Sequence, residues 1–115
     1  MKIKVAEEVP AKDVVAPGAS GVRIRLLIHE AEKAPNFHMR QFTVAPGGHT
    51  PKHTHPWEHE VFVLEGSGTV VTAEAELPLG PGQCVYVAPD ELHQFRNTGA
   101  DELKFLCLVP KEGSK

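Results

Sequence analysis

The chain has 115 residues, of which ten are proline, ten are glycine and seven are histidine. This length suits one ordinary domain, and the stretches free of proline and glycine are too short for a helical bundle, because helices average ~11–12 residues and tolerate neither residue well in their interiors. Fifteen acidic and twelve basic residues give a net charge of −3 without a basic run, which argues against a nucleic-acid partner.

Membrane and secretion signals are not evident. No apolar stretch approaches the ~20 residues that cross a bilayer, and residues 1–10 contain four charged side chains where a signal peptide has an apolar core. We therefore expect a cytoplasmic protein without a membrane partner. Cys84 and Cys107 lie far apart in apolar runs, which favours two reduced thiols buried in strands over a disulfide.

Taken in chain order, the sequence predicts short strands separated by turns. The first 20 residues are expected to be peripheral. Apolar side chains alternate over residues 22–28, which is typical of a half-buried strand, and a helical turn can follow within residues 29–34. A second strand over residues 37–44 is expected to stop at the Ala-Pro-Gly-Gly segment 45–48.

The remaining predicted strands cover residues 59–64, 69–76, 84–87, 93–96 and 103–109. The turns between them lie at residues 65–68, where we expect a hairpin, at 78–82 and at 97–99. Seven or so strands at this spacing favour an all-β sandwich or small barrel. We expect one domain over residues 1–115, with its barrel core at about 22–110 and a peripheral tail at 111–115.

Histidines cluster just before and at the start of the strand at 59–64. His53 and His55 are two residues apart, so on an extended backbone both rings point to one face. His59 shares a face with Val61 and Val63, while Glu60 points to the other side. Three buried imidazoles are costly to desolvate, and one shared divalent cation is the simplest partner that satisfies all of them.

His93, on a separate strand, offers a fourth ligand. A lone histidine in a strand is more often a surface or hydrogen-bonded core residue, and we give His29, His38 and His49 that interpretation. The HxHxxxH spacing reverses these odds for His53 and its two companions.

These residues lie within two segments that resemble the cupin motifs. The first comprises Gly47, His53, His55, the residue at the fourth ligand position and residues 63–66; the second comprises Gly82, His93 and Asn97. Counting back from Gly66, the usual cupin glutamate falls on His59 and not on Glu60. The segments 35–37, 56–60, 95–97 and 105–113 are similar to small all-histidine cupins known as manganese-binding homodimers in thermophilic bacteria.

The sequence departs from the cupin pattern in one loop of the second motif and at the fourth ligand position. In the second motif Ala88 occupies the common proline position and Asp90 the common glycine position, although aspartate tolerates a left-handed turn. A histidine in place of the carboxylate leaves the metal with its full formal charge, which makes it a stronger Lewis acid. Four nitrogen ligands suit manganese, iron, nickel, copper and zinc alike.

The resemblance implies a single-domain jelly-roll barrel (the double-stranded β-helix of the cupins) with a metal at His53, His55, His59 and His93, manganese first among the candidates. It implies a homodimer and a metal-dependent oxidoreductase, of which an O2-using dioxygenase acting on a small organic substrate is the leading hypothesis. The alternatives are a non-enzymatic cupin, which either binds a small ligand or uses the metal only to stabilise the barrel, and a cupin isomerase or decarboxylase. No carboxylate base is evident on the inward face, which argues mildly against the last two reactions.

Four further residues are candidates for the pocket. Phe95, Phe105 and Cys107 are expected to face inward, and the phenylalanines would make a narrow apolar entrance suited to small, partly hydrophobic substrates. Cys107 is interpreted as a wall residue and not as a nucleophile. Arg40 would hold a substrate carboxylate if it faces inward and would be an ordinary solvated charge if it faces outward; the pattern leaves both open.

The predicted outward face of the last strand is unusually apolar. Leu106 and Leu108 share that face with Lys104. Either the N-terminal strand or a second subunit is expected to cover it, and the resemblance favours the second subunit.

Overall fold

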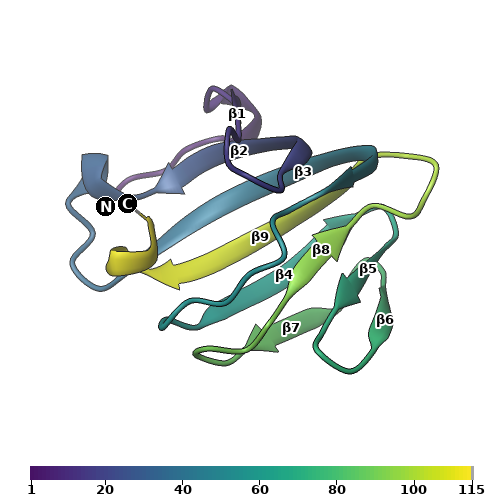
Figure 1. Ribbon diagram of the computed structural model, residues 1–115. Coiled ribbons are helices and arrows are strands. Elements are labelled where there is room, and N and C mark those ends of the chain that lie inside the picture. Colours follow the sequence, from purple (N-terminus) through teal and green to yellow (C-terminus); the bar gives the residue numbers. More distant parts are fainter. Residues whose placement is uncertain (115) are drawn as a thin grey trace.

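Nine β-strands and three short 3₁₀ helices make up the computed structural model, which describes residues 1–114 (Figure 1). The strands are β1 (Lys12–Asp13), β2 (Ser20–Ile28), β3 (Phe37–His49), β4 (His59–Glu65), β5 (Gly68–Val71), β6 (Glu76–Leu79), β7 (Cys84–Val87), β8 (Gln94–Arg96) and β9 (Leu103–Pro110). The 3₁₀ helices are η1 (Ala6–Glu8), η2 (Glu30–Glu32) and η3 (Lys111–Ser114). The predicted all-β class is confirmed, and the helical turn expected within residues 29–34 corresponds to η2.

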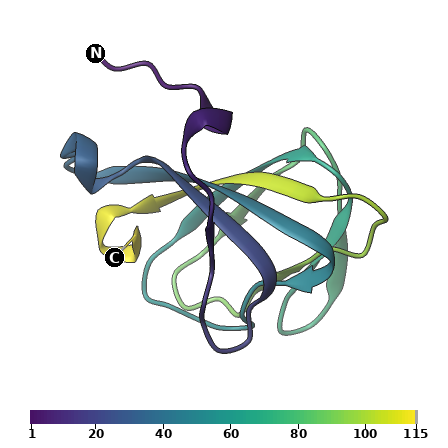
Figure 2. The ribbon, with the colours of Figure 1, turned by 90° about the horizontal axis from the view of Figure 1, so that it is seen from above.

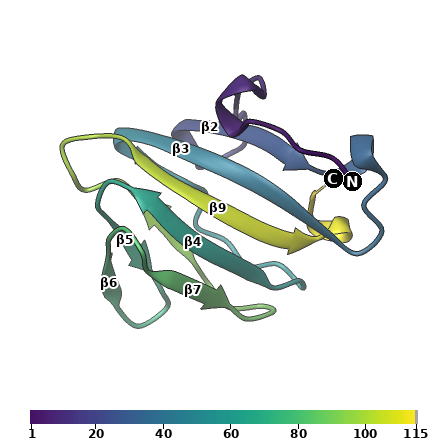
Figure 3. The same ribbon diagram turned by 180° about the vertical axis from the view of Figure 1, so that it is seen from behind.

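All strand pairs are antiparallel, and the strands follow one another across the sheet in the order β6-β5-β8-β3-β9-β4-β7, with β2 on β3 and β1 on β2. Long β3 joins the two halves, since it pairs with β2 and β9 along most of its length and with β8 through His49 and Arg96 at its end. The sheet therefore curls into a half-barrel (Figures 1 and 2). Seen from behind, β9 lies between β3 and β4 (Figure 3).

Buried and more exposed residues alternate along β4 and β9, as predicted for β9. Leu103, Phe105, Cys107 and Val109 are buried, whereas the residues between them are partly exposed. The Phe105 ring stacks on Phe42 with 5.4 Å between ring centroids and lies 5.0 Å from Phe95. Because side chains on one face recur every second residue, this alternation also decides which side chains point toward the histidines.

The prediction that the second strand stops at residues 45–48 is wrong, because β3 continues to His49. Gly47 adopts a left-handed φ of 81°, and the β2–β3 register shifts beside it. This irregularity accommodates Pro46, which has no N–H for a sheet ladder. The Gly47 N–H donates to the Asn97 carbonyl at 3.2 Å, so the end of β3 is held against the other half of the barrel.

The hairpin predicted at residues 65–68 is also wrong, because β4 pairs with β7 and β9, whereas β5 pairs with β6 and β8. Gly66, with a φ of 83°, turns the chain from one half of the sheet to the other. The strand predicted over residues 69–76 is divided, since Thr72 Oγ1 accepts hydrogen bonds from the backbone of Glu74 and Ala75. Pro78, expected in a break, lies in edge strand β6, where a missing N–H is tolerated.

The burial of one cysteine differs from the prediction, whereas that of one histidine agrees with it. Cys84 is a free thiol, as expected, but it is exposed on β7. His38, interpreted as a surface or hydrogen-bonded core residue, is of the second kind: it is only 3% exposed, and its Nε2 lies 3.3 Å from the Ala34 carbonyl oxygen. The burial of Cys84 was predicted wrongly because the sequence pattern did not show that its strand, β7, lies at the edge of the sheet.

The N-terminal segment packs mainly on β2 and reaches the outward face of β9 at one point, where Glu7 Oε1 of η1 lies 3.4 Å from Lys104 Nζ. β1 pairs with β2, with Lys12 opposite Ile24, and the chain before it extends away from the barrel (Figure 2). On β4, which pairs with β9, Phe62 remains 43% exposed. The N-terminal segment therefore leaves the β4 side of this face open and contacts its β9 side through Glu7. Within residues 1–114, no helix is long and apolar enough to cross a membrane.

Candidate metal centre

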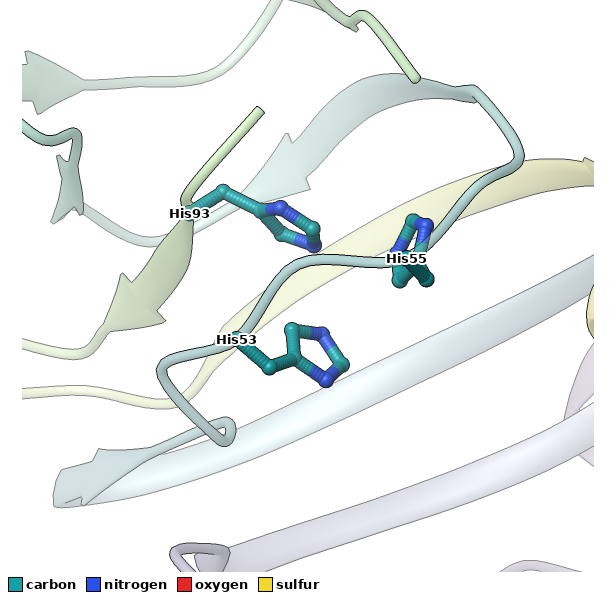
Figure 4. A group of neighbouring side chains, drawn as sticks. All are labelled: His53, His55 and His93. Atoms are coloured by element: carbon teal, nitrogen blue, oxygen red, sulfur yellow. The ribbon is translucent and has the colours of Figure 1, made fainter. Parts of the chain in front are cut away.

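Four histidines meet where the segment before β4 runs antiparallel to the chain at the start of β8. His53 and His93 face each other in an isolated antiparallel bridge, in which each backbone N–H donates to the other residue's carbonyl at 3.1 Å. His55 follows His53 on the same segment, and His59 is the first residue of β4. Figure 4 shows His53 and His55 on one segment and His93 on the neighbouring one, with the three rings close together.

Three of these residues form a tight group. The candidate ligand nitrogens of His53, His55 and His93 all lie within 4.8 Å of one another. The ring of His59 also belongs to the cluster, with its centroid 4.3 Å from His55 and 5.4 Å from His93. This geometry makes the cluster a candidate metal site with a trio at its centre and His59 beside it.

Backbone carbonyls fix which nitrogen each ring presents to the cluster. His55 Nδ1 donates to the Trp57 carbonyl at 2.7 Å, and His93 Nδ1 donates to the Glu91 carbonyl at 2.8 Å. Because a carbonyl only accepts, both rings carry their proton on Nδ1 and keep the Nε2 lone pair free. Nε2 of His55 is buried without a hydrogen-bond partner, which is the arrangement that a metal ion satisfies.

Burial keeps the imidazoles of His53, His59 and His93 neutral. It is the largest cause that lowers the pKa of His59 to about 3, and the Arg40 charge and the other three rings lower it further. Burial, followed by the neighbouring rings, lowers the pKa of His53 to about 4, and burial also lowers the pKa of His93. Only a neutral imidazole can coordinate a metal, so these rings are ready to bind one at neutral pH.

The loop that departs from the cupin pattern supports His55. Asp90 adopts the left-handed conformation expected of it, with a φ of 63°. Its backbone N–H donates to the His55 carbonyl at 2.8 Å. The ring of Trp57 stacks on His55 with 4.8 Å between centroids and an interplanar angle of 7°. The sequence did not predict these supports, because carbonyl and stacking partners depend on loop geometry and not on residue type.

Glu60, the other residue considered for the fourth ligand position, points away from the cluster. It is exposed on β4 and lies opposite Tyr86 of β7. His59, its neighbour, is 7% exposed and faces inward. The alternation along β4 thus agrees with the assignment of the fourth position to His59.

A cavity of about 150 Å³ adjoins the histidines. Phe95, Phe105, Cys107 and Arg40 line it together with His53, His59 and His93. A wider depression of about 680 Å³ lies between the N-terminal segment and β2, on a different part of the surface. We take the smaller cavity as the functional one, because of these two it alone is lined by residues of the histidine cluster.

Arg40 faces inward, which settles the orientation that the sequence left open. It lies on β3 directly opposite Cys107 of β9, and its Nη2 donates to Cys107 Sγ at 3.2 Å. The same sulfur is 3.3 Å from His59 Nδ1. Burial raises the pKa of the Cys107 thiol, so this residue is a neutral link between Arg40 and His59 in addition to a wall of the cavity.

Comparison with known proteins identifies a family whose model matches this chain and several related proteins. The model of the family described as a cupin domain matches residues 40–109, more than half of the chain. Auxin-binding protein 1 of Arabidopsis thaliana is 26% identical over 118 residues, which cover 95% of this chain and 59% of that protein. The 1-methylthio-D-xylulose 5-phosphate methylsulfurylase of Rhodospirillum rubrum is 35% identical over 77 residues, covering 67% of this chain and 49% of that protein. The chain spans about half the length of the curated relatives it matches.

Comparison with solved structures finds proteins with the same fold. The polyketide cyclase RemF from Streptomyces resistomycificus superposes with a TM-score of 0.92 at 35% identity, over 96% of this chain and 80% of RemF. A predicted oxalate decarboxylase from Thermotoga maritima superposes with a TM-score of 0.84 at 23% identity, over 95% of this chain and 98% of that one, and this likeness shows the fold alone.

Proposed function

The chain belongs to the cupin domain family, and from this premise we propose that it is a metal-dependent oxidoreductase. His53, His55, His59 and His93 bind one divalent transition metal, with manganese the first candidate and iron, nickel, copper and zinc the others. The substrate is a small, partly apolar molecule with a carbon–carbon double bond. O2 adds its two oxygen atoms across the cleaved bond, so one alkene and one O2 give two carbonyl groups without a further reductant.

One observation carries this proposal: neutral imidazoles converge beside an apolar cavity, and none of the described residues that line the cavity is a carboxylate. Isomerases and decarboxylases of this fold need a base to move a proton. Cleavage of an alkene by O2 moves no proton in its overall balance. This site therefore suits best the reaction that needs the fewest acidic and basic side chains.

The metal, when bound, supplies open coordination positions and the redox chemistry that activates O2. The chain's own residues hold and shape the site. The carbonyls of Trp57 and Glu91 orient His55 and His93, and Cys107 contacts His59. Phe95 and Phe105 line the cavity, where they exclude water and pack against the apolar part of the substrate.

A second reaction, cyclisation of a polyketide, is favoured by the 35% identity and TM-score of 0.92 to RemF. The cavity volume argues against it. Pockets that bury drug-sized ligands measure ~300–1,000 Å³, whereas this cavity measures about 150 Å³. A polyketide could place only one end among the histidines.

The proposed assembly is a homodimer formed through the outer face of β4, β7 and β9. Phe62 and Tyr86 on this face are 43% and 59% exposed, and the N-terminal strand lies elsewhere. Light scattering on the protein at micromolar concentration is expected to give twice the chain mass, and Phe62→Glu is expected to shift it to the monomer.

Oxygen consumption tests the reaction. Protein stripped with a chelator is reloaded with manganese or iron and mixed with 4-vinylphenol, a short diketone or a polyketide mimic, and products are identified by mass spectrometry. Two carbonyl products formed for each alkene and each O2 consumed support the oxidoreductase, and an O2-independent ring closure supports the cyclase. Binding without turnover by either metal form would leave a non-enzymatic binding protein. His93→Ala is the inactive control.

A further inference from the structure

A cationic side chain stands without a counter-ion in the cavity. Nη2 of Arg40 donates to Cys107 Sγ at 3.2 Å, and its guanidinium carbon lies 5.1 Å from the centroid of the Phe42 ring. Nε of Arg40 is buried and has no hydrogen-bond partner. A guanidinium has five N–H donors and a sulfur is a weak acceptor, so most of the hydrogen-bonding capacity of Arg40 remains unused.

Two other arginines on the neighbouring strand provide the contrast. Arg23 lies 3.9 Å from Asp13, and Arg25 lies 3.2 Å from Glu7. No described acidic side chain lines the cavity that contains Arg40, and none of the ion pairs found within residues 1–114 involves it. A charge held in apolar surroundings is costly unless it is paired, which indicates that its partner is a ligand.

The position of Arg40 says where such a ligand would lie. Cys107 Sγ contacts Arg40 on one side and His59 Nδ1 at 3.3 Å on the other. The Arg40 charge also contributes to the low pKa of His59. An anion on Arg40 would therefore lie one side chain away from the histidine cluster, with Phe95 and Phe105 beside it in the same cavity.

From these contacts we infer that Arg40 is the anchor for a substrate carboxylate, and that the substrate is a small unsaturated monocarboxylate. The planar guanidinium fork matches the two oxygens of a carboxylate, which displaces the weakly accepting thiol of Cys107. The apolar body of the molecule lies against the phenylalanines, and its double bond points toward the histidines. This inference rests on the proposed function for the reaction, but the anchoring itself depends only on Arg40.

The test is a comparison of two probes that differ only in charge, cinnamate and cinnamamide, by isothermal titration calorimetry. It uses zinc-loaded protein, in which no oxidation occurs, and chelator-treated protein. We expect cinnamate to bind about 10- to 100-fold more tightly than the amide, as a hydrogen-bonded charge pair provides. Arg40→Gln is expected to abolish the preference, and Arg40→Lys to retain part of it. Arg23→Gln removes the same charge from an exposed position and is expected to keep the wild-type preference.

Equal binding of the two probes by the wild type, absence of detectable cinnamate binding, or an unchanged preference in Arg40→Gln would each overturn the anchoring role. The wild-type comparison needs no variant, so it remains decisive if Arg40→Gln does not fold. A carboxylate preference in the chelator-treated protein, combined with no O2 consumption by any metal form, would reject the proposed function and retain the anchor. O2 consumption with the same KM for cinnamate and cinnamamide would reject the anchor and retain the proposed function.

Discussion

Replacement of His59 by alanine separates the four-histidine site from a three-histidine site. His59 is 7% exposed, and its ring centroid lies 4.3 Å from that of His55. The tight trio of His53, His55 and His93 would remain after the change. If His59 is a ligand, its loss removes one of four metal–nitrogen bonds and leaves a small cavity beside Cys107.

The expected loss of affinity can be bounded from below. Removing a residue that merely orients a metal ligand costs ~10–100-fold in affinity. Loss of the ligand itself should cost at least ~100-fold, equivalent to about 2.7 kcal/mol. The assay is a competition titration of manganese or zinc against a chelator of known affinity, read together with the manganese electron paramagnetic resonance spectrum.

Glu60→Ala is the matched control, because Glu60 is the next residue on β4 and is exposed on the opposite face. It is expected to bind metal as the wild type does. Unchanged affinity and spectrum in His59→Ala would refute the fourth ligand. Loss of metal in Glu60→Ala, with His59→Ala unaffected, would refute the inward assignment of β4.

Other consequences concern stability and the loops around the site. In metal-free protein burial lowers the pKa of folded His59 to about 3, well below the ~6.5 of a histidine in an unfolded chain, so the unfolded chain binds more protons and stability falls as the pH drops below about 6.5. At pH 5 His59 alone is expected to contribute a loss on the order of 2 kcal/mol relative to pH 7, measured by urea unfolding, and His59→Ala should remove that share of the dependence; a pH-independent wild type would contradict the burial argument. Asn97 is 3% exposed and donates to the carbonyls of two separate segments at 2.8 Å each, so Asn97→Ala should lower the free energy of unfolding by ~2–3 kcal/mol, while the exposed Thr98→Ala changes it little. Asp90→Val forces a β-branched side chain into a φ of 63°; it should destabilise the protein by ~1–2 kcal/mol and weaken metal binding through His55, and wild-type affinity in this variant would show that the loop does not support the ligand.

The strands and inward faces were predictable wherever one side of a strand is buried. The alternation on β9 identified Phe105 and Cys107 as inward residues, and the alternation on β4 separated His59 from Glu60, because side chains switch faces at every residue. The HxH spacing likewise placed His53 and His55 together. These inferences need only the local backbone.

Pairing between distant strands was not predictable in the same way. Gly66 looked like a hairpin turn, but the strands on either side of it join different neighbours, and local sequence does not encode that choice. Arg40 stayed ambiguous because its strand is partly buried on both faces; only the register with Cys107 resolves its orientation. The carbonyl partners of His55 and His93 depend on loop conformation and carry no residue signature.

Anomalous diffraction from crystals of protein loaded with one equivalent of manganese would show whether four histidines bind one ion. We expect one peak per chain, bonded to Nε2 of His53, His55, His59 and His93, with the remaining coordination positions open to the cavity. A peak bonded to three histidines with His59 still turned toward Cys107, or a peak at Glu60, would contradict it.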